Sequence, residues 1–125
     1  MDRPPRVLVV DDTEAVRTLI RTILELEGIE VFTATDGQAA LDSVAEVEPD
    51  LITMDVVMPR LDGLAAAAAL KARPDTSRIP IVMVSARAQA ADRAKGAGAG
   101  ADAYLTKPFE PGDLLAAVRS LLPAD

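Results

Sequence analysis

Short apolar runs that alternate with segments of helical spacing constrain the fold of this chain more than any other feature. Residues 7–10 and 51–54 are continuous or nearly continuous apolar runs, too short for helices and typical of strands buried on both faces. Three further strands are predicted at residues 30–35, 79–84 and 103–106. Because a helical segment separates each strand from the next, we predict a parallel sheet with helices on both of its faces.

The segments between these strands carry apolar residues at the three- and four-residue spacing of amphipathic helices. Five helices are predicted, around residues 16–24, 40–44, 64–70, 87–98 and 114–122. The fourth should be a poor helix, because it has almost no large apolar side chain and a glycine costs roughly 0.5–1 kcal/mol against alanine in a helix. No linker, low-complexity tract or internal repeat interrupts the pattern. Residues 1–125 are therefore expected to form one α/β domain with a doubly wound sheet.

The composition narrows the class of function. A formal net charge of −7 gives no electrostatic reason to expect nucleic-acid or anionic-membrane binding. The chain has no cysteine and no histidine, so any bound metal should be a hard cation held by oxygen atoms. The first residues lack the apolar core of a signal peptide, and no run reaches membrane-spanning length. We expect a cytoplasmic protein.

Polar residues follow four of the predicted strands, at the sheet edge where open α/β folds bind their ligands. They are Asp11 with Asp12, Asp55, Ser85 and Lys107. Three close carboxylates repel one another unless a cation joins them, and Mg²⁺ accepts such ligands. The Lys107 ammonium and the Ser85 hydroxyl suit phosphate oxygens. A carboxylate beside a metal and a lysine can act as a nucleophile, and Asp55 is the candidate for an aspartyl phosphate.

Simpler roles remain open for these residues when each is taken alone. Asp12 could cap the first helix, and Asp55 could be an ordinary turn residue. Ser85 could be a strand-end hydroxyl, Lys107 a solvated side chain and Tyr104 packing at the edge of the core. The company of three acids favours the functional interpretation of Lys107.

Four groups of residues resemble the receiver domain of bacterial two-component response regulators, over residues 7 to about 122. They are Asp11-Asp12, then Met54-Asp55 followed by Pro59 and Asp62-Gly63, then Ser85-Ala86, and lastly the segment from Tyr104 to Phe109. Each group alone is weak evidence, but four in order at the proper spacing are specific. The resemblance implies a flavodoxin-like fold. It also implies that Asp55 accepts a phosphoryl group from the phosphohistidine of a histidine kinase or a histidine phosphotransfer protein.

The resemblance further implies a metal site. Mg²⁺ is expected to be held by Asp12, Asp55 and the backbone carbonyl of Val57, with Asp11 acting mainly through water. Apart from its own phosphorylation and dephosphorylation, the chain is expected to catalyse no reaction.

The same resemblance assigns the remaining residues of the site. Lys107 pairs with the phosphoryl group, and Ser85 with its neighbour Ala86 binds it. Tyr104 turns inward in response. The peptide bond between Lys107 and Pro108 resembles a cis peptide of the family, although the sequence permits either isomer.

Two positions are expected to tune how long the phosphate lasts: Val57, two residues after Asp55, and Arg87, two after Ser85. Apolar Val57 offers no hydrogen bond to the attacking water, so we hypothesise a long-lived phosphorylated form. The switching face is expected to comprise residues 87–98, 103–106 and 114–122. It should bind a downstream protein, with the chain itself a monomer or a weak dimer.

Other functions are less favoured. A phosphatase of the haloacid-dehalogenase type needs a second aspartate two residues after the first, where this chain has Val57. A flavodoxin-type cofactor carrier needs a first loop rich in glycine and hydroxyls, whereas Asp11-Asp12 repels phosphate unless a metal is bound. A pseudo-receiver that switches without phosphate stays open. We expect a stand-alone regulator, with a receiver cut from a longer protein as the alternative.

Overall fold

The computed structural model of the chain describes residues 3–123, which form alternating strands and helices. In chain order the elements are β1 (Arg6–Val10), α1 (Glu14–Glu25), β2 (Glu30–Ala34), α2 (Gly37–Val47), β3 (Leu51–Met54), α3 (Gly63–Ala72), β4 (Ile81–Ser85), α4 (Ala90–Gly98), β5 (Ala103–Thr106) and α5 (Pro111–Leu121). All strand pairs are parallel, in the order β2-β1-β3-β4-β5. The predicted doubly wound sheet with five helices is confirmed.

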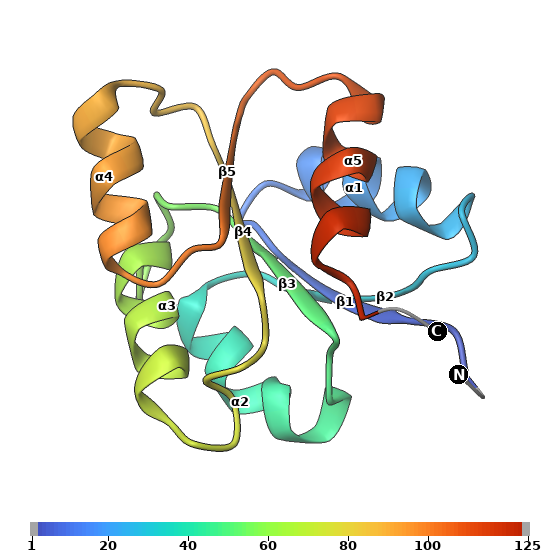
Figure 1. Cartoon of the computed structure of the whole chain (residues 1–125), viewed down its shortest axis with the longest axis horizontal. Helices are drawn as coiled ribbons and strands as arrows, with labels where there is room; N and C mark the ends of the chain where they lie inside the picture. Colours follow the sequence, from blue (N-terminus) through green and yellow to red (C-terminus); the bar gives the residue numbers. More distant parts are fainter. Residues whose placement is uncertain (1–2, 124–125) are drawn as a thin grey trace.

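Helices cover both faces of the sheet (Figure 1): α1 and α5 lie on one side, and α2, α3 and α4 on the other. On the first side, Val7 and Val9 of β1 belong to a buried cluster with residues of α1 and α5. On the second side, Leu8 and Val10 of the same strand belong to another cluster. Because side chains alternate along a strand, one continuous apolar run serves both cores.

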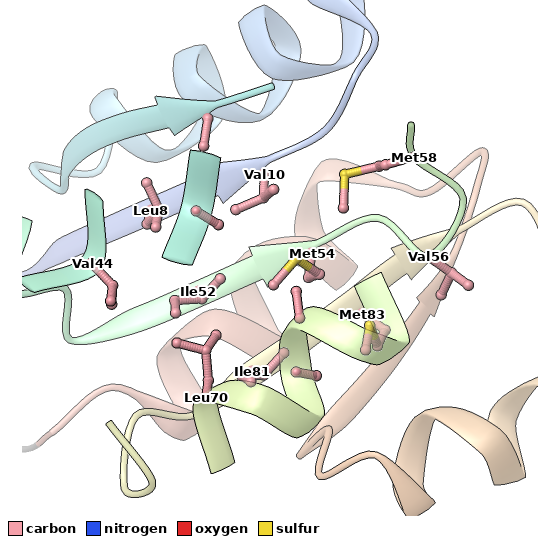
Figure 2. Close-up of a cluster of buried hydrophobic side chains, with 14 residues drawn as sticks. Leu8, Val10, Val44, Ile52, Met54, Val56, Met58, Leu70, Ile81 and Met83 are labelled. Atoms are coloured by element: carbon pink, nitrogen blue, oxygen red, sulfur yellow. The ribbon is translucent and has the colours of Figure 1, made fainter. Parts of the chain in front are cut away.

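The second cluster lies between the sheet and helices α2 and α3 (Figure 2). Val44 of α2 and Leu70 of α3 pack there against Ile52 and Met54 of β3, and all four side chains are at most 2% exposed. β3 is therefore buried on both faces in the centre of the sheet. Asp55 follows β3 directly and is therefore attached to the end of a fully buried central strand.

Several element boundaries shift by one to three residues from the prediction, and two elements begin later than predicted. β4 begins at Ile81 instead of residue 79, because Pro80 has no N–H to donate to the sheet. α4 begins at Ala90 instead of residue 87, since the Gln89 and Asp92 side chains form a capping box at its start.

Helix α4 is as loosely packed as its composition predicted: within Ala90–Gly98 only Gly96 is buried. In the part of the chain that the structure describes, no helix combines the length and apolar character needed to cross a membrane.

Candidate functional site

Sheet hydrogen bonds continue past the ends of the strands and fix the polar residues there. The backbone N–H of Asp11 donates to the Ala34 carbonyl at 3.2 Å, and that of Asp55 donates to the Val10 carbonyl at 2.9 Å. The Lys107 N–H donates to the Ser85 carbonyl at 2.8 Å. These residues therefore keep the register of the sheet and project from one edge of it.

Asp11, Asp12 and Asp55 form an acidic cluster at this edge. One carboxylate oxygen from each lies within 4.8 Å of the others. Asp11 is 1% exposed and Asp55 7%, whereas Asp12 is exposed. The Thr13 N–H donates to Oδ1 of Asp11 at 2.9 Å and orients that carboxylate. Thr13 is the N-cap residue of α1 and makes no side-chain cap bond, so the alternative that Asp12 caps the helix is wrong.

Lys107 lies inside the cluster and is not a solvated side chain. Its Nζ is 2.8 Å from Oδ2 of Asp11 and 3.5 Å from Oδ2 of Asp55, and the side chain is 19% exposed. The peptide bond between Lys107 and Pro108 is cis. Of the two isomers that the sequence permitted, the structure therefore has the one that the resemblance implied.

One ammonium does not balance three carboxylates. Burial raises the pKa of Asp55 above its ordinary value, and the negative charge of Asp11 raises it further, while Lys107 acts in the opposite direction. The three carboxylates thus carry more negative charge than Lys107 neutralises, and all of their potential metal ligands are oxygen atoms. Such a cluster can bind a hard metal cation.

The loop after Asp55 depends on a close backbone contact that the sequence analysis missed. The Gly63 N–H donates to the Val56 carbonyl at 2.8 Å, and a Cβ at position 63 would lie 2.0 Å from the carbonyl oxygen of Asp55. Only glycine fits there. The Asp62-Gly63 pair was the available signal: Asp62 caps α3 by accepting a hydrogen bond from the Ala65 N–H at 2.8 Å.

The same loop is fastened to the start of α2, which was also not predicted. The Gly37 N–H donates to the Leu61 carbonyl at 3.0 Å. Arg60 has a φ of 67°, a left-handed conformation uncommon for this residue type, and its Nε lies 3.5 Å from Oδ2 of the buried Asp36. A charged residue in a turn gave no sequence signal for this contact.

Ser85 and Tyr104 are linked through the backbone of Arg87. The Arg87 N–H donates to Oγ of Ser85 at 3.1 Å, and the Tyr104 hydroxyl donates to the Arg87 carbonyl at 2.6 Å. Ser85 is 1% exposed, while Ala86 and Arg87 are exposed. Tyr104 also packs against the apolar cluster. It therefore fills the edge of the core, as the simpler interpretation expected, and makes this hydrogen bond as well.

Val57, whose carbonyl the sequence analysis assigned to the metal, lies in the loop after β3 with its side chain 52% exposed. The structure brings Asp11, Asp12, Asp55 and Lys107 into one site. Ser85 lies next to this site, and its carbonyl accepts a hydrogen bond from the Lys107 N–H.

Comparisons with known proteins identify the family to which the chain belongs. The family model of the response regulator receiver domain matches residues 7–119. The response regulator MprA of Mycolicibacterium vanbaalenii is 46% identical over 119 residues, which make up 95% of this chain and 51% of that protein. Protein PilG of Pseudomonas aeruginosa is 39% identical over 95% of this chain and 88% of its own length.

A solved structure shows the same fold. The chemotaxis protein CheY4 of Vibrio cholerae superposes with a TM-score of 0.90 at 32% identity, covering 95% of this chain and 99% of that one. The chain spans about half the length of MprA, the curated relative with the higher identity of the two. The family model and the shared fold point to the same family. The chain belongs to the response regulator receiver domain family of two-component signalling.

Proposed function

We propose that Asp55 is the phosphoryl acceptor of this receiver domain and that its donor is the phosphohistidine of a histidine kinase or a histidine phosphotransfer protein. The observation that carries the proposal is the position of Asp55. It is a buried carboxylate with a raised pKa, 3.5 Å from Lys107 and within the acidic cluster. The site combines a nucleophile, oxygen ligands and a fixed positive charge.

Asp12, Asp55 and the Val57 carbonyl would hold Mg²⁺ in this proposal, with Asp11 acting mainly through water. The donor set fits such an ion: all ligands are oxygen atoms, and the carboxylates outnumber the ammonium of Lys107. When bound, the ion supplies charge neutralisation at the transferring phosphoryl group.

The residues of the chain would position and bind the phosphoryl group. An oxygen of Asp55 attacks phosphorus, and the bond from phosphorus to the donor's imidazole nitrogen breaks, leaving its electron pair on that nitrogen. Lys107 would bind one phosphoryl oxygen through its ammonium. Because the Ser85 hydroxyl accepts a hydrogen bond from Arg87, its own hydrogen is available for a second oxygen, beside the N–H of Ala86.

The new dianionic group must favour one arrangement of a two-state element, or no signal passes. We assign that role to the face formed by α4, β5 and α5, with Tyr104 turning inward as it shifts. The loose packing of α4 supports this assignment. A downstream protein partner would bind this face of a monomer or weak dimer in the cytoplasm. We propose a signalling switch that catalyses only its own phosphorylation and dephosphorylation.

Incubation with acetyl phosphate and Mg²⁺, followed by intact mass measurement, tests the acceptor and the metal together. The mass should increase by one phosphoryl group, and the increase should be absent with EDTA or in Asp55→Asn. Asp75→Asn, which changes an exposed acid in the loop after α3, is the matched control and should be modified like wild type. If neither acetyl phosphate nor a phosphorylated histidine kinase modifies the wild type, the assignment of the site is wrong.

A further inference from the structure

Arg93 joins the loosely packed helix α4 to strand β5. Its guanidinium carbon lies 5.2 Å from the centre of the Tyr104 ring. Gly96, three residues later and on the same face of α4, meets the same ring: a Cβ at this position would lie 3.0 Å from Cδ2 of Tyr104. The Tyr104 ring therefore contacts α4 in two places: the guanidinium of Arg93 and the backbone of Gly96, which has no side chain.

Arg93 also makes polar contacts with β5. Its Nη2 donates to Oγ1 of Thr106 at 2.8 Å, and its Nη1 makes a longer bond of 3.5 Å to the Tyr104 carbonyl. None of the ion pairs in residues 3–123 includes Arg93. A planar guanidinium can stack on a ring and donate to a hydroxyl at the same time, which a lysine ammonium cannot do with the same geometry.

The contact with Tyr104 leads back to Ser85. The Tyr104 hydroxyl donates to the Arg87 carbonyl at 2.6 Å, and the Arg87 N–H donates to Oγ of Ser85 at 3.1 Å. By holding the Tyr104 ring, Arg93 restrains the turn whose Arg87 N–H donates to the Ser85 hydroxyl.

The contact with Thr106 leads to the same place by another route. Thr106 directly precedes Lys107, whose N–H donates to the Ser85 carbonyl at 2.8 Å and whose Nζ lies in the acidic cluster. Arg93 thus closes a ring of contacts that starts and ends at Ser85 and passes through α4 and β5.

We propose that Arg93 is a positioning residue that couples the attachment of α4 to anion binding at the Asp55 site. The inference rests on the proposed function and deepens it, since it names the side chain through which α4 acts on Ser85 and Lys107. We take the observed position of Tyr104, half-buried against Gly96 and the apolar cluster, as its inward position. Arg93 favours this position and that of Thr106, and thereby favours the positions of the two phosphate-binding groups, Ser85 and Lys107. Coupling is reciprocal, and an anion in the site therefore strengthens the attachment of α4.

The chain provides its own probe for this coupling. Tyr104 is its only tyrosine and tryptophan is absent, so protein made with 3-fluorotyrosine has a single fluorine, on this ring. Beryllofluoride, a phosphoryl mimic, is added at saturating Mg²⁺ to wild type, Arg93→Gln and Arg93→Lys, and fluorine NMR follows the ring. Arg21→Gln is the matched control, because Arg21 pairs with Glu25 on the surface of α1, on the other face of the sheet.

We expect Arg93→Gln to raise the beryllofluoride concentration at half-saturation about three- to tenfold, the range of a stacked and hydrogen-bonded arginine at a surface. Arg93→Lys should lie between Arg93→Gln and wild type, and Arg21→Gln should match wild type. Hydrogen exchange of the α4 amides should be faster in Arg93→Gln, with β1 and β3 amides unchanged as evidence that the variant is folded.

Two outcomes overturn the coupling. If Arg93→Gln has the half-saturation of wild type or a lower one, Arg93 does not position the site, even if the α4 amides exchange faster. In that case the proposed function stands. If wild type itself shows no response to beryllofluoride and is modified neither by acetyl phosphate nor by a phosphorylated histidine kinase, the proposed function fails, and the coupling fails with it.

Discussion

Replacing Asp55 with asparagine is expected to make the protein more stable at neutral pH when no divalent cation is present. The substitution keeps the size and shape of the side chain but removes one negative charge from a buried position that is 7% exposed. Asn can still accept a hydrogen bond from Lys107 through its amide oxygen. The change therefore tests the charge of the cluster more than its packing.

The magnitude follows from opposing interactions. At 4.8 Å, the outer limit of the cluster's spacing, the buried Asp11 repels Asp55 by about 3.5 kcal/mol at an effective dielectric constant of about 20. Asp12 is exposed, so solvent screens its charge and its repulsion is weaker. Lys107, 3.5 Å from Asp55, attracts it by about 4–5 kcal/mol on the same scale. These interactions nearly cancel, so the unfavourable burial of the carboxylate decides the sign. We expect the free energy of unfolding to rise by about 1–3 kcal/mol in Asp55→Asn.

The pH dependence gives this prediction a second check. Burial, and next the charge of Asp11, raise the folded-state pKa of Asp55 above 3.8. The folded protein therefore binds this proton more tightly than the unfolded chain, and the resulting stability is present at low pH. It is lost as the pH rises from about 4 through the raised pKa. Asp55→Asn lacks that loss, and its advantage over wild type should grow across this range.

Urea unfolding in EDTA, followed by circular dichroism between pH 4 and 7.5, measures both effects. Mg²⁺ should then reduce the difference, because binding to the folded wild type stabilises it by mass action. Asp75→Asn, at an exposed acid, should stay within about 0.5 kcal/mol of wild type. Equal or lower stability of Asp55→Asn in EDTA at pH 7 would refute the charge argument.

Three further predictions concern other parts of the molecule. Thr53 is 1% exposed, and its hydroxyl has no hydrogen-bond partner within residues 3–123. Because Thr53→Val removes this unpaired polar group, it should raise the free energy of unfolding by about 1 kcal/mol in urea denaturation, and a decrease would contradict this. A Cβ at Gly98 meets open space, so Gly98→Ala should stabilise by about 0.5–1 kcal/mol, whereas Gly96→Ala, which presses on Tyr104, should be the less stable of the two in the same assay. Val57→Asn should shorten the lifetime of the phosphorylated form measured by loss of the added mass, and equal rates in the two proteins would end the hypothesis that Val57 prolongs it.

The parts of the site that follow from sheet geometry could be predicted from the sequence. Asp11, Asp55 and Lys107 each follow a strand directly, and parallel strands bring their carboxyl ends to one edge. Their separation along the chain did not matter, because the apolar runs already defined the strands. The same logic placed Ser85 beside Lys107.

Contacts that depend on loop conformation or on helix orientation could not be predicted. The left-handed Arg60 and its ion pair with Asp36 need the path of a loop that periodicity does not describe. Arg93 contacts Thr106 only because α4 starts at Ala90 and presents this face to β5. The cap of α1 failed as an alternative for Asp12, because the helix begins one residue later than that role requires.

The measurement that tests the central claim most directly locates the phosphoryl group. Protein treated with acetyl phosphate and Mg²⁺ is reduced with borohydride, which converts an acyl phosphate on aspartate to homoserine, and the peptides are then analysed by mass. The account predicts that one peptide changes, the one containing Asp55, with a carbonyl oxygen replaced by two hydrogens at that residue. Homoserine at Asp11 or Asp12 while Asp55 stays intact would contradict it.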